Sequence, residues 1–102
     1  METSMILALE PAHVDMAQAQ NFSSTSQDRA QGFDILGNGK SAKLGWQMQD
    51  YNPAGAVGNA AAASADKGRA VVAAAGRSLA RLLAEIDQLP LSTLVERPDF
   101  SA

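Results

Sequence analysis

The most regular apolar pattern lies in the second half of the chain. Apolar side chains recur there at alternating spacings of three and four residues, at positions 72, 75, 79, 82, 86 and 89. This spacing places them on one face of a helix. It predicts a final amphipathic helix over residues 64–89, which Pro90 ends. The tail, residues 90–102, contains little that would order it.

Gly68 and Gly76 interrupt this helical pattern, although each glycine costs a helix about 1 kcal/mol relative to alanine. Three alanines at positions 73–75 lie between them. Such a concentration of small residues predicts a close backbone contact between the helix and a neighbouring element.

A second apolar run, Met5 to Leu9, predicts a short helix from Thr3 to Leu9 within a first segment of residues 1–16. Thr3 is the candidate N-cap, and Pro11 disfavours helix for the residue before it. A helix that is apolar on every face requires burial on all sides. We therefore expect a short buried helix followed by a turn.

Polar residues dominate the centre of the chain, where residues 17–43 predict a long excursion over a surface. Within it, residues 36–40 hold two glycines around an asparagine, which indicates a tight turn rather than a phosphate loop. Apolar and polar residues then alternate from Leu44 to Met48. This alternation predicts a strand, followed by an Asn-Pro-x-Gly turn, within a strand-and-loop segment of residues 44–63.

The chain of 102 residues corresponds to one small domain or part of one. It has 20 alanines, whereas Val, Ile, Leu and Phe together number 21, about one residue in five. So few large apolar side chains make an independent core marginal in so short a chain. We therefore expect the chain to need packing contacts with residues outside this chain.

Charge and cysteine content exclude several classes of function. The net charge is −3, and no basic cluster offers a footprint for nucleic acid. The absence of cysteine excludes disulfides, zinc ribbons and thiolate nucleophiles. No export signal and no apolar run of about 20 residues is present, so we expect no membrane association and a cytoplasmic location.

Candidate chemistry is sparse. His13 is the only histidine and has no ligand partner at helical spacing, and no serine has a Gly-x-Ser-x-Gly setting. Glu2 is the best single candidate for a catalytic or cleft carboxylate, because it directly precedes an apolar helix. A plain charge at the positive end of the helix dipole is an equally good interpretation of Glu2.

Two blocks resemble the creatininase (creatinine amidohydrolase) family. Residues 2–15, ETSMILALEPAHVD, are similar to the family segment H-x-G-x-x-E-T-S-x-x-L-A-L-x-P-x-x-V-D. Residues 49–68 resemble its Pro-x-Gly-x-x-Gly-Asp loop and the start of its final helix, with Asn59 replacing the usual aspartate.

The resemblance implies an α/β fold: a C-terminal fragment of a three-layer α/β/α hydrolase, mostly helix and loop with one or two short strands. Family members hold two divalent metals, zinc or manganese, through motifs upstream of the matched region, so no cofactor site is expected in this chain. The implied partners are the missing N-terminal portion of the domain, a small-molecule substrate and, when complete, further copies in a homo-oligomer.

Three hypotheses about function follow. The chain is part of a metal-dependent hydrolase of cyclic amides or related C–N bonds, inactive by itself. Alternatively, it is a structural or oligomer-interface segment without chemistry, or a degenerate remnant.

Overall fold

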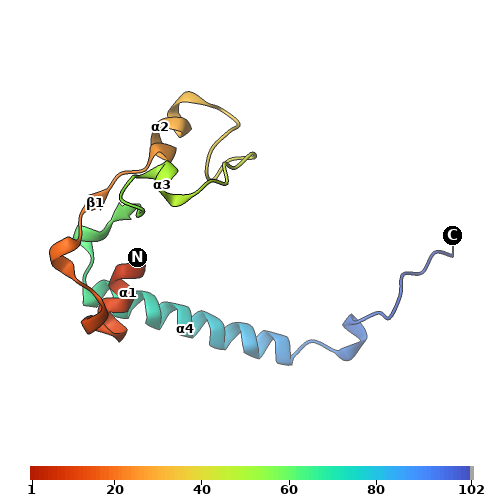
Figure 1. Cartoon of the computed structure of the whole chain (residues 1–102). Helices are drawn as coiled ribbons and strands as arrows, with labels where there is room; N and C mark the ends of the chain where they lie inside the picture. Colours follow the sequence, from red (N-terminus) through yellow and green to blue (C-terminus); the bar gives the residue numbers. More distant parts are fainter. Residues whose placement is uncertain (102) are drawn as a thin grey trace.

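The computed structural model describes residues 1–101 and shows a mostly helical chain with one small sheet (Figure 1). Two strands form this sheet, and they pair antiparallel with Asn21 opposite Asn59 and Phe22 opposite Gly58. The helices and strands are α1 (Glu2–Leu9), β1 (Asn21–Phe22), α2 (Thr25–Gly32), α3 (Met48–Tyr51), β2 (Gly58–Asn59) and α4 (Ala65–Asp87). Short 3₁₀ turns occupy Pro11–His13, Met16–Gln18, Ala60–Ala62 and Leu91–Thr93.

The chain is extended. Its radius of gyration is 20.5 Å, against about 13 Å for a compact domain of this length. Its accessible surface is 8386 Å², whereas a compact protein of this mass exposes about 5,500 Å². Figure 1 shows why: α4 projects away from the rest, and the C-terminal tail continues beyond it. Among residues 1–101, no hydrophobic side chain is buried.

The long final helix is present as α4. Ser64 is its N-cap, and the Ser64 side chain accepts a hydrogen bond from the Lys67 amide at 3.3 Å. The short first helix is present too, and it ends at Leu9 before the proline. The prediction that Thr3 caps α1 is wrong, because the Met1 carbonyl already accepts the Met5 amide at 3.2 Å and the helix begins at Glu2.

The contact between α1 and α4 is the best-packed place in the molecule. Ser4 is 4% exposed, and its hydroxyl oxygen accepts the Ser64 amide at 3.1 Å. Gly68 is buried against the backbone of α1. The predicted close approach is therefore confirmed at Gly68, whereas nothing among residues 1–101 lies within 4 Å of a β-carbon position at Gly76.

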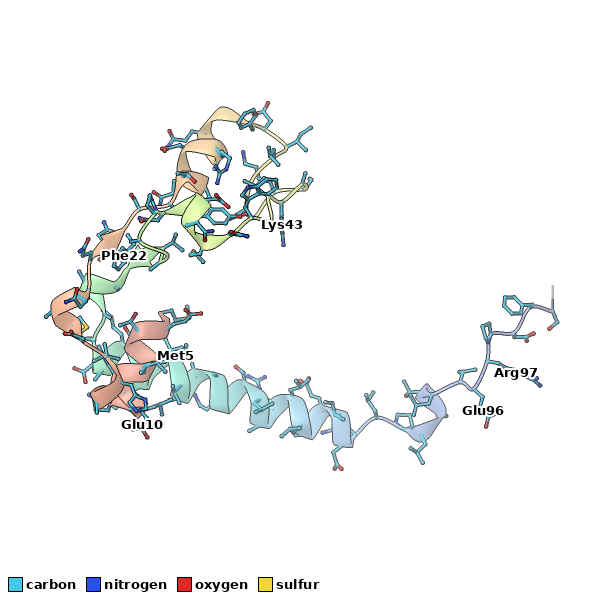
Figure 2. The ribbon with its side chains drawn as sticks, in the orientation of Figure 1. Met5, Glu10, Phe22, Lys43, Glu96 and Arg97 are labelled. Atoms are coloured by element: carbon cyan, nitrogen blue, oxygen red, sulfur yellow. The ribbon has the colours of Figure 1, made fainter. Side chains whose placement is uncertain are left out.

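Burial of α1 on all sides is not found in this chain. Ile6 is 41% exposed and Leu9 is 60% exposed, because α4 covers only one side of α1. Figure 2 shows Met5, on α1, beside the beginning of α4. The opposite side of α1 has no neighbour among the described residues that would bury these two side chains.

The centre of the chain contains more regular structure than its polar sequence predicts. Residues 17–43 include β1 and α2, and the Ser24 hydroxyl caps α2 by accepting the Ser26 amide at 3.2 Å. The predicted strand from Leu44 to Met48 is wrong. Met48 instead begins α3, whose first turn is fixed by a hydrogen bond of 3.1 Å from the Gln47 amide to the Asp50 carboxylate.

α2 and α3 form a small outer lobe together with the connecting residues 33–47. The Thr25 hydroxyl donates to the Asp50 carbonyl at 3.0 Å, and the Asn52 side-chain amide donates to the Ser23 carbonyl at 2.8 Å. Asn52 also begins the predicted turn, in which Gly55 takes a positive φ of 74° and donates its amide to the Asn52 carbonyl. The Thr25 contact joins α2 to α3 within the lobe, and the Asn52 contact attaches the lobe to Ser23, directly after β1.

Candidate functional site

The two sequence blocks singled out above meet in space. α1 carries Glu2, and β2 together with the 3₁₀ turn after it carries Asn59 and Ala60. The hydrogen bond from Ser64 to Ser4 holds the beginning of α4 against α1. The start of the Glu-Thr-Ser run and the end of the glycine-rich loop consequently lie side by side.

Between them lies a small open cleft of about 80 Å³, here called the Glu2 cleft. Its lining residues come from the beginning of α1 and from the chain around β2: Met1, Glu2, Thr3, Val57, Gly58, Asn59, Ala60 and Ala63. Gly58 has a positive φ of 98°, a conformation that favours glycine over residues with side chains. A larger residue at position 58 would strain the segment that places Asn59.

Glu2 is an exposed side chain in the first turn of α1. A carboxylate at this end of a helix interacts favourably with the helix dipole. Within residues 1–101, Glu2 forms no ion pair, since the single ion pair found there joins Arg69 to Asp66. Both interpretations of Glu2, a cleft carboxylate and a helix-terminal charge, are compatible with this placement.

Asn59 occupies the position at which the family pattern has aspartate. It is exposed, and it lines both the Glu2 cleft and a larger open cavity of about 480 Å³. A carboxamide there supplies a donor and an acceptor without charge. Glu2 is therefore the only charged side chain that lines the Glu2 cleft in the described part of the chain.

The larger cavity was not predicted from the sequence. It lies between the outer lobe and the strand pair, and its lining carries hydroxyl and amide groups together with the side chains of Phe22, Met48 and Tyr51. β1, α2, α3 and β2 together bring these groups into one lining, and α2 formed within the predicted surface excursion. Ser24, which caps α2 in the structure, is the local signal that could have indicated a helix there.

His13 and the other titratable residues do not extend the Glu2 cleft. His13 lies exposed in the 3₁₀ turn after α1. The pKa of Asp99 is lowered by hydrogen bonds from the Ser101 hydroxyl and amide, and Asp99 belongs to the exposed C-terminal tail. Figure 2 shows Glu96 and Arg97 in that same tail, far from α1.

The described residues do not fit a divalent-metal centre. Within residues 1–101, no three histidine, aspartate or glutamate side chains lie close enough together to hold an ion. Protein sites for zinc or manganese need about three or more such ligands that converge.

No helix among the described residues has the length and apolar character needed to cross a membrane.

Comparison with known protein families identifies a match. Residues 1–83 match the sequence profile of the family described as creatinine amidohydrolase. Because this match covers most of the chain, the protein belongs to the creatinine amidohydrolase family. Neither a curated protein nor a solved structure matches the chain.

Proposed function

We propose that this chain is the C-terminal portion of a creatinine amidohydrolase-like domain and functions within a hydrolase of cyclic amides or related C–N bonds. Family membership supports the class of reaction. The observation that carries the proposal is the open architecture, in which no hydrophobic side chain of residues 1–101 is buried. Ile6 and Leu9 on α1 form the apolar surface on which the N-terminal portion would pack.

Metal chemistry is assigned to that N-terminal portion, since the described residues offer no ligand cluster. Zinc or manganese is the metal that the family resemblance implies. This chain contributes the Glu2 cleft, in which the Glu2 carboxylate can accept a hydrogen bond from a substrate N–H or orient a histidine of the other portion. The expected substrate is a small molecule.

By this proposal the isolated chain has no hydrolase activity. Amide hydrolysis near neutral pH requires an activated nucleophile, and a lone carboxylate acting as a base supplies only about 10²–10⁴-fold acceleration. Typical enzymes achieve 10⁶-fold or more. The alternative is that this chain is a structural segment without any chemistry. The two proposals differ in whether Glu2 is needed for activity.

The experiment extends the reading frame upstream to include Glu-x-His-Gly and His-x-Gly motifs, and measures creatinine ring opening with manganese or zinc. We expect activity in the extended protein and none in the 102-residue chain. Glu2→Gln should abolish most of this activity without unfolding the protein. Glu10→Gln, the same chemical change at the other end of α1, is the matched control and should retain activity.

Two results would contradict the proposal. Turnover by the isolated chain would show that no other portion is required. Full activity of Glu2→Gln in the extended protein would reduce Glu2 to a helix-terminal charge and favour the structural alternative.

A further inference from the structure

The cavity of about 480 Å³ between the outer lobe and the strand pair has no role in the proposed function. It is here called the lobe cavity. Its volume lies in the range of small-molecule sites, which is about 300–1,000 Å³. The Glu2 cleft, at about 80 Å³, is several times smaller. In Figure 1 the elements around the lobe cavity, β1, α2 and α3, form one arm of the molecule, apart from α4.

The lobe cavity has an uncharged lining. Within residues 1–101, no acidic, basic or histidine side chain lines it. Two basic residues of the outer lobe make other contacts: Lys40 Nζ donates to the Ala30 carbonyl at 2.7 Å, and the Arg29 guanidinium lies over the Tyr51 ring, 5.5 Å from its centre. A charged ligand would lose hydration in the cavity without gaining an ion pair, which is unfavourable. The lining therefore favours a neutral ligand.

Side-chain amides supply most of the polarity of this lining. Asn59, at the position where the family pattern has aspartate, lines the lobe cavity as a neutral group. Three more carboxamides line it, those of Asn21, Gln27 and Asn38. Each carboxamide offers a hydrogen-bond donor beside an acceptor. This pair of groups matches the hydrogen-bonding edge of a nucleobase, as in the bidentate contact of Asn or Gln with adenine.

Asn38 reaches the cavity through the glycine turn of residues 36–40, for which the sequence already disfavours a phosphate loop. Gly39 has a positive φ of 78°, and the Gly37 amide donates to the Ala42 carbonyl at 2.8 Å. The turn contributes an amide and no cation to the lining. Its contribution therefore suits a base rather than a phosphate.

Two aromatic rings give the lobe cavity an apolar wall. Phe22 comes from β1 and Tyr51 from α3, and both are half-buried. Figure 2 shows Phe22 on β1, between α1 and the outer lobe. Tyr51 is held in place because its hydroxyl donates to the Leu44 carbonyl at 2.5 Å. Aromatic side chains bind bases by stacking, whichever base is present.

Hydroxyl groups line the part of the cavity where α2 begins. They belong to Ser23, Ser24 and Ser26. The hydroxyl oxygens of Ser24 and Ser26 are 2.7 Å apart and share a hydrogen bond. A serine hydroxyl can both donate and accept, as can each hydroxyl of a sugar. The cavity thus combines groups that suit a planar base with groups that suit an uncharged sugar.

We propose that the lobe cavity is a binding site for a neutral nucleoside. The base lies against Phe22 and Tyr51, the carboxamides bond its edge, and the serine hydroxyls face the ribose. A nucleotide binds less well, because its phosphate finds no cation in the lining. The proposal does not rest on the hydrolase function. Creatinine ring opening by the extended protein is measured separately, so either proposal can fail alone.

Isothermal titration calorimetry on the 102-residue chain tests the binding, with adenosine, guanosine, cytidine and uridine as probes. We expect at least one of them to bind saturably with a Kd below about 1 mM. Its 5′-monophosphate should bind at least about tenfold more weakly. Free ribose should bind more weakly still, since it has no base to stack. No saturable binding of any nucleoside, or equal binding of ribose, would overturn the proposal.

A matched pair of variants tests the aromatic wall. Phe22→Leu keeps an apolar side chain but removes the ring, and should weaken nucleoside binding at least about fivefold. Phe33→Leu makes the same change at an exposed residue of the outer lobe that does not line the cavity, and should leave binding unchanged. Equal affinities of the two variants would contradict the role of Phe22.

A gain of binding tests the charge argument, and unfolding cannot imitate it. Ser23→Lys adds a cation beside the proposed ribose position at an exposed residue. It should tighten binding of the 5′-monophosphate by about two- to fivefold and leave the nucleoside unchanged. This gain should disappear at high salt, because it is an exposed ion pair. A variant that still binds the monophosphate as weakly as the natural chain would overturn the proposed placement of the ribose.

Discussion

The carbonyl group of Ser4 lies directly against the α-carbon of Gly68, so that a β-carbon at residue 68 would overlap the Ser4 carbonyl oxygen. It would also lie 2.9 Å from the Met5 amide nitrogen. Both neighbours are backbone atoms, which cannot move away as a flexible side chain would. This contact joins the two blocks that resemble the family, and both lie within the matched residues 1–83.

Gly68→Ala should therefore destabilise the protein. Relief of the overlap requires α1 to move away from α4, and overpacking of this kind costs about 1–3 kcal/mol. Because α1·α4 is the largest contact in the molecule, we expect α1 to detach before α4 unfolds. Urea unfolding followed by circular dichroism measures the loss in the free energy of unfolding.

Gly76→Ala is the matched control in the same helix. Nothing lies within 4 Å of the added methyl group, so only helix propensity changes. We expect the free energy of unfolding to rise by up to about 1 kcal/mol. If both variants are stabilised equally, the close approach at Gly68 is wrong.

Removal of the Ser4 hydroxyl should also weaken the joint between the helices. Ser4→Ala deprives the Ser64 amide of its acceptor at the point where α4 begins. An amide left without a partner costs about 1–3 kcal/mol when it is buried, and Ser64 is only partly buried, so we expect a value near the lower end. The melting temperature measures this loss of stability. Ser78→Ala, at an exposed site on α4, is the control. A decrease in Ser4→Ala no larger than in the control would contradict the role of the Ser4 hydroxyl.

Periodicity predicted α4 well because a stripe over about five turns leaves little choice of structure. It failed from Leu44 to Met48, where alternation over a few residues has no partner strand to pair with, and where Gln47 and Asp50 instead fix a helical turn. The short strands that do form are two residues long, and no pattern in two residues can be read as a strand.

For the candidate site, the sequence indicated Glu2 and Asn59 but not their proximity, which depends on the strand pair and on the bond from Ser64 to Ser4. The large cavity beside Phe22 was missed, since it requires α2 to fold within a polar segment. The Ser24 cap is a local feature that a sequence pattern could have indicated, whereas the contacts between α2 and α3 are long-range and left no local pattern.

The outer lobe should open when Asn52 is replaced. Its side chain joins the lobe to Ser23 and also accepts the Ala54 amide at 2.8 Å, so Asn52→Ala removes both contacts. Cleavage by a lysine-specific protease at Lys40 and Lys43 should become several-fold faster, while cleavage at Lys67 in α4 should not change. Equal acceleration at all three lysines would indicate global unfolding instead.

The extended architecture should be visible in the thermodynamics of unfolding. A compact protein of this mass buries about 10,000 Å² on folding, whereas the surface of 8386 Å² leaves this chain with about 7,000 Å² buried. Denaturant m-values and the heat-capacity change both scale with that area. We expect both to be about two thirds of the values for a compact domain of 102 residues. Values equal to those of a compact domain would show that the chain packs onto itself in solution, and that no other portion is needed to cover Ile6 and Leu9.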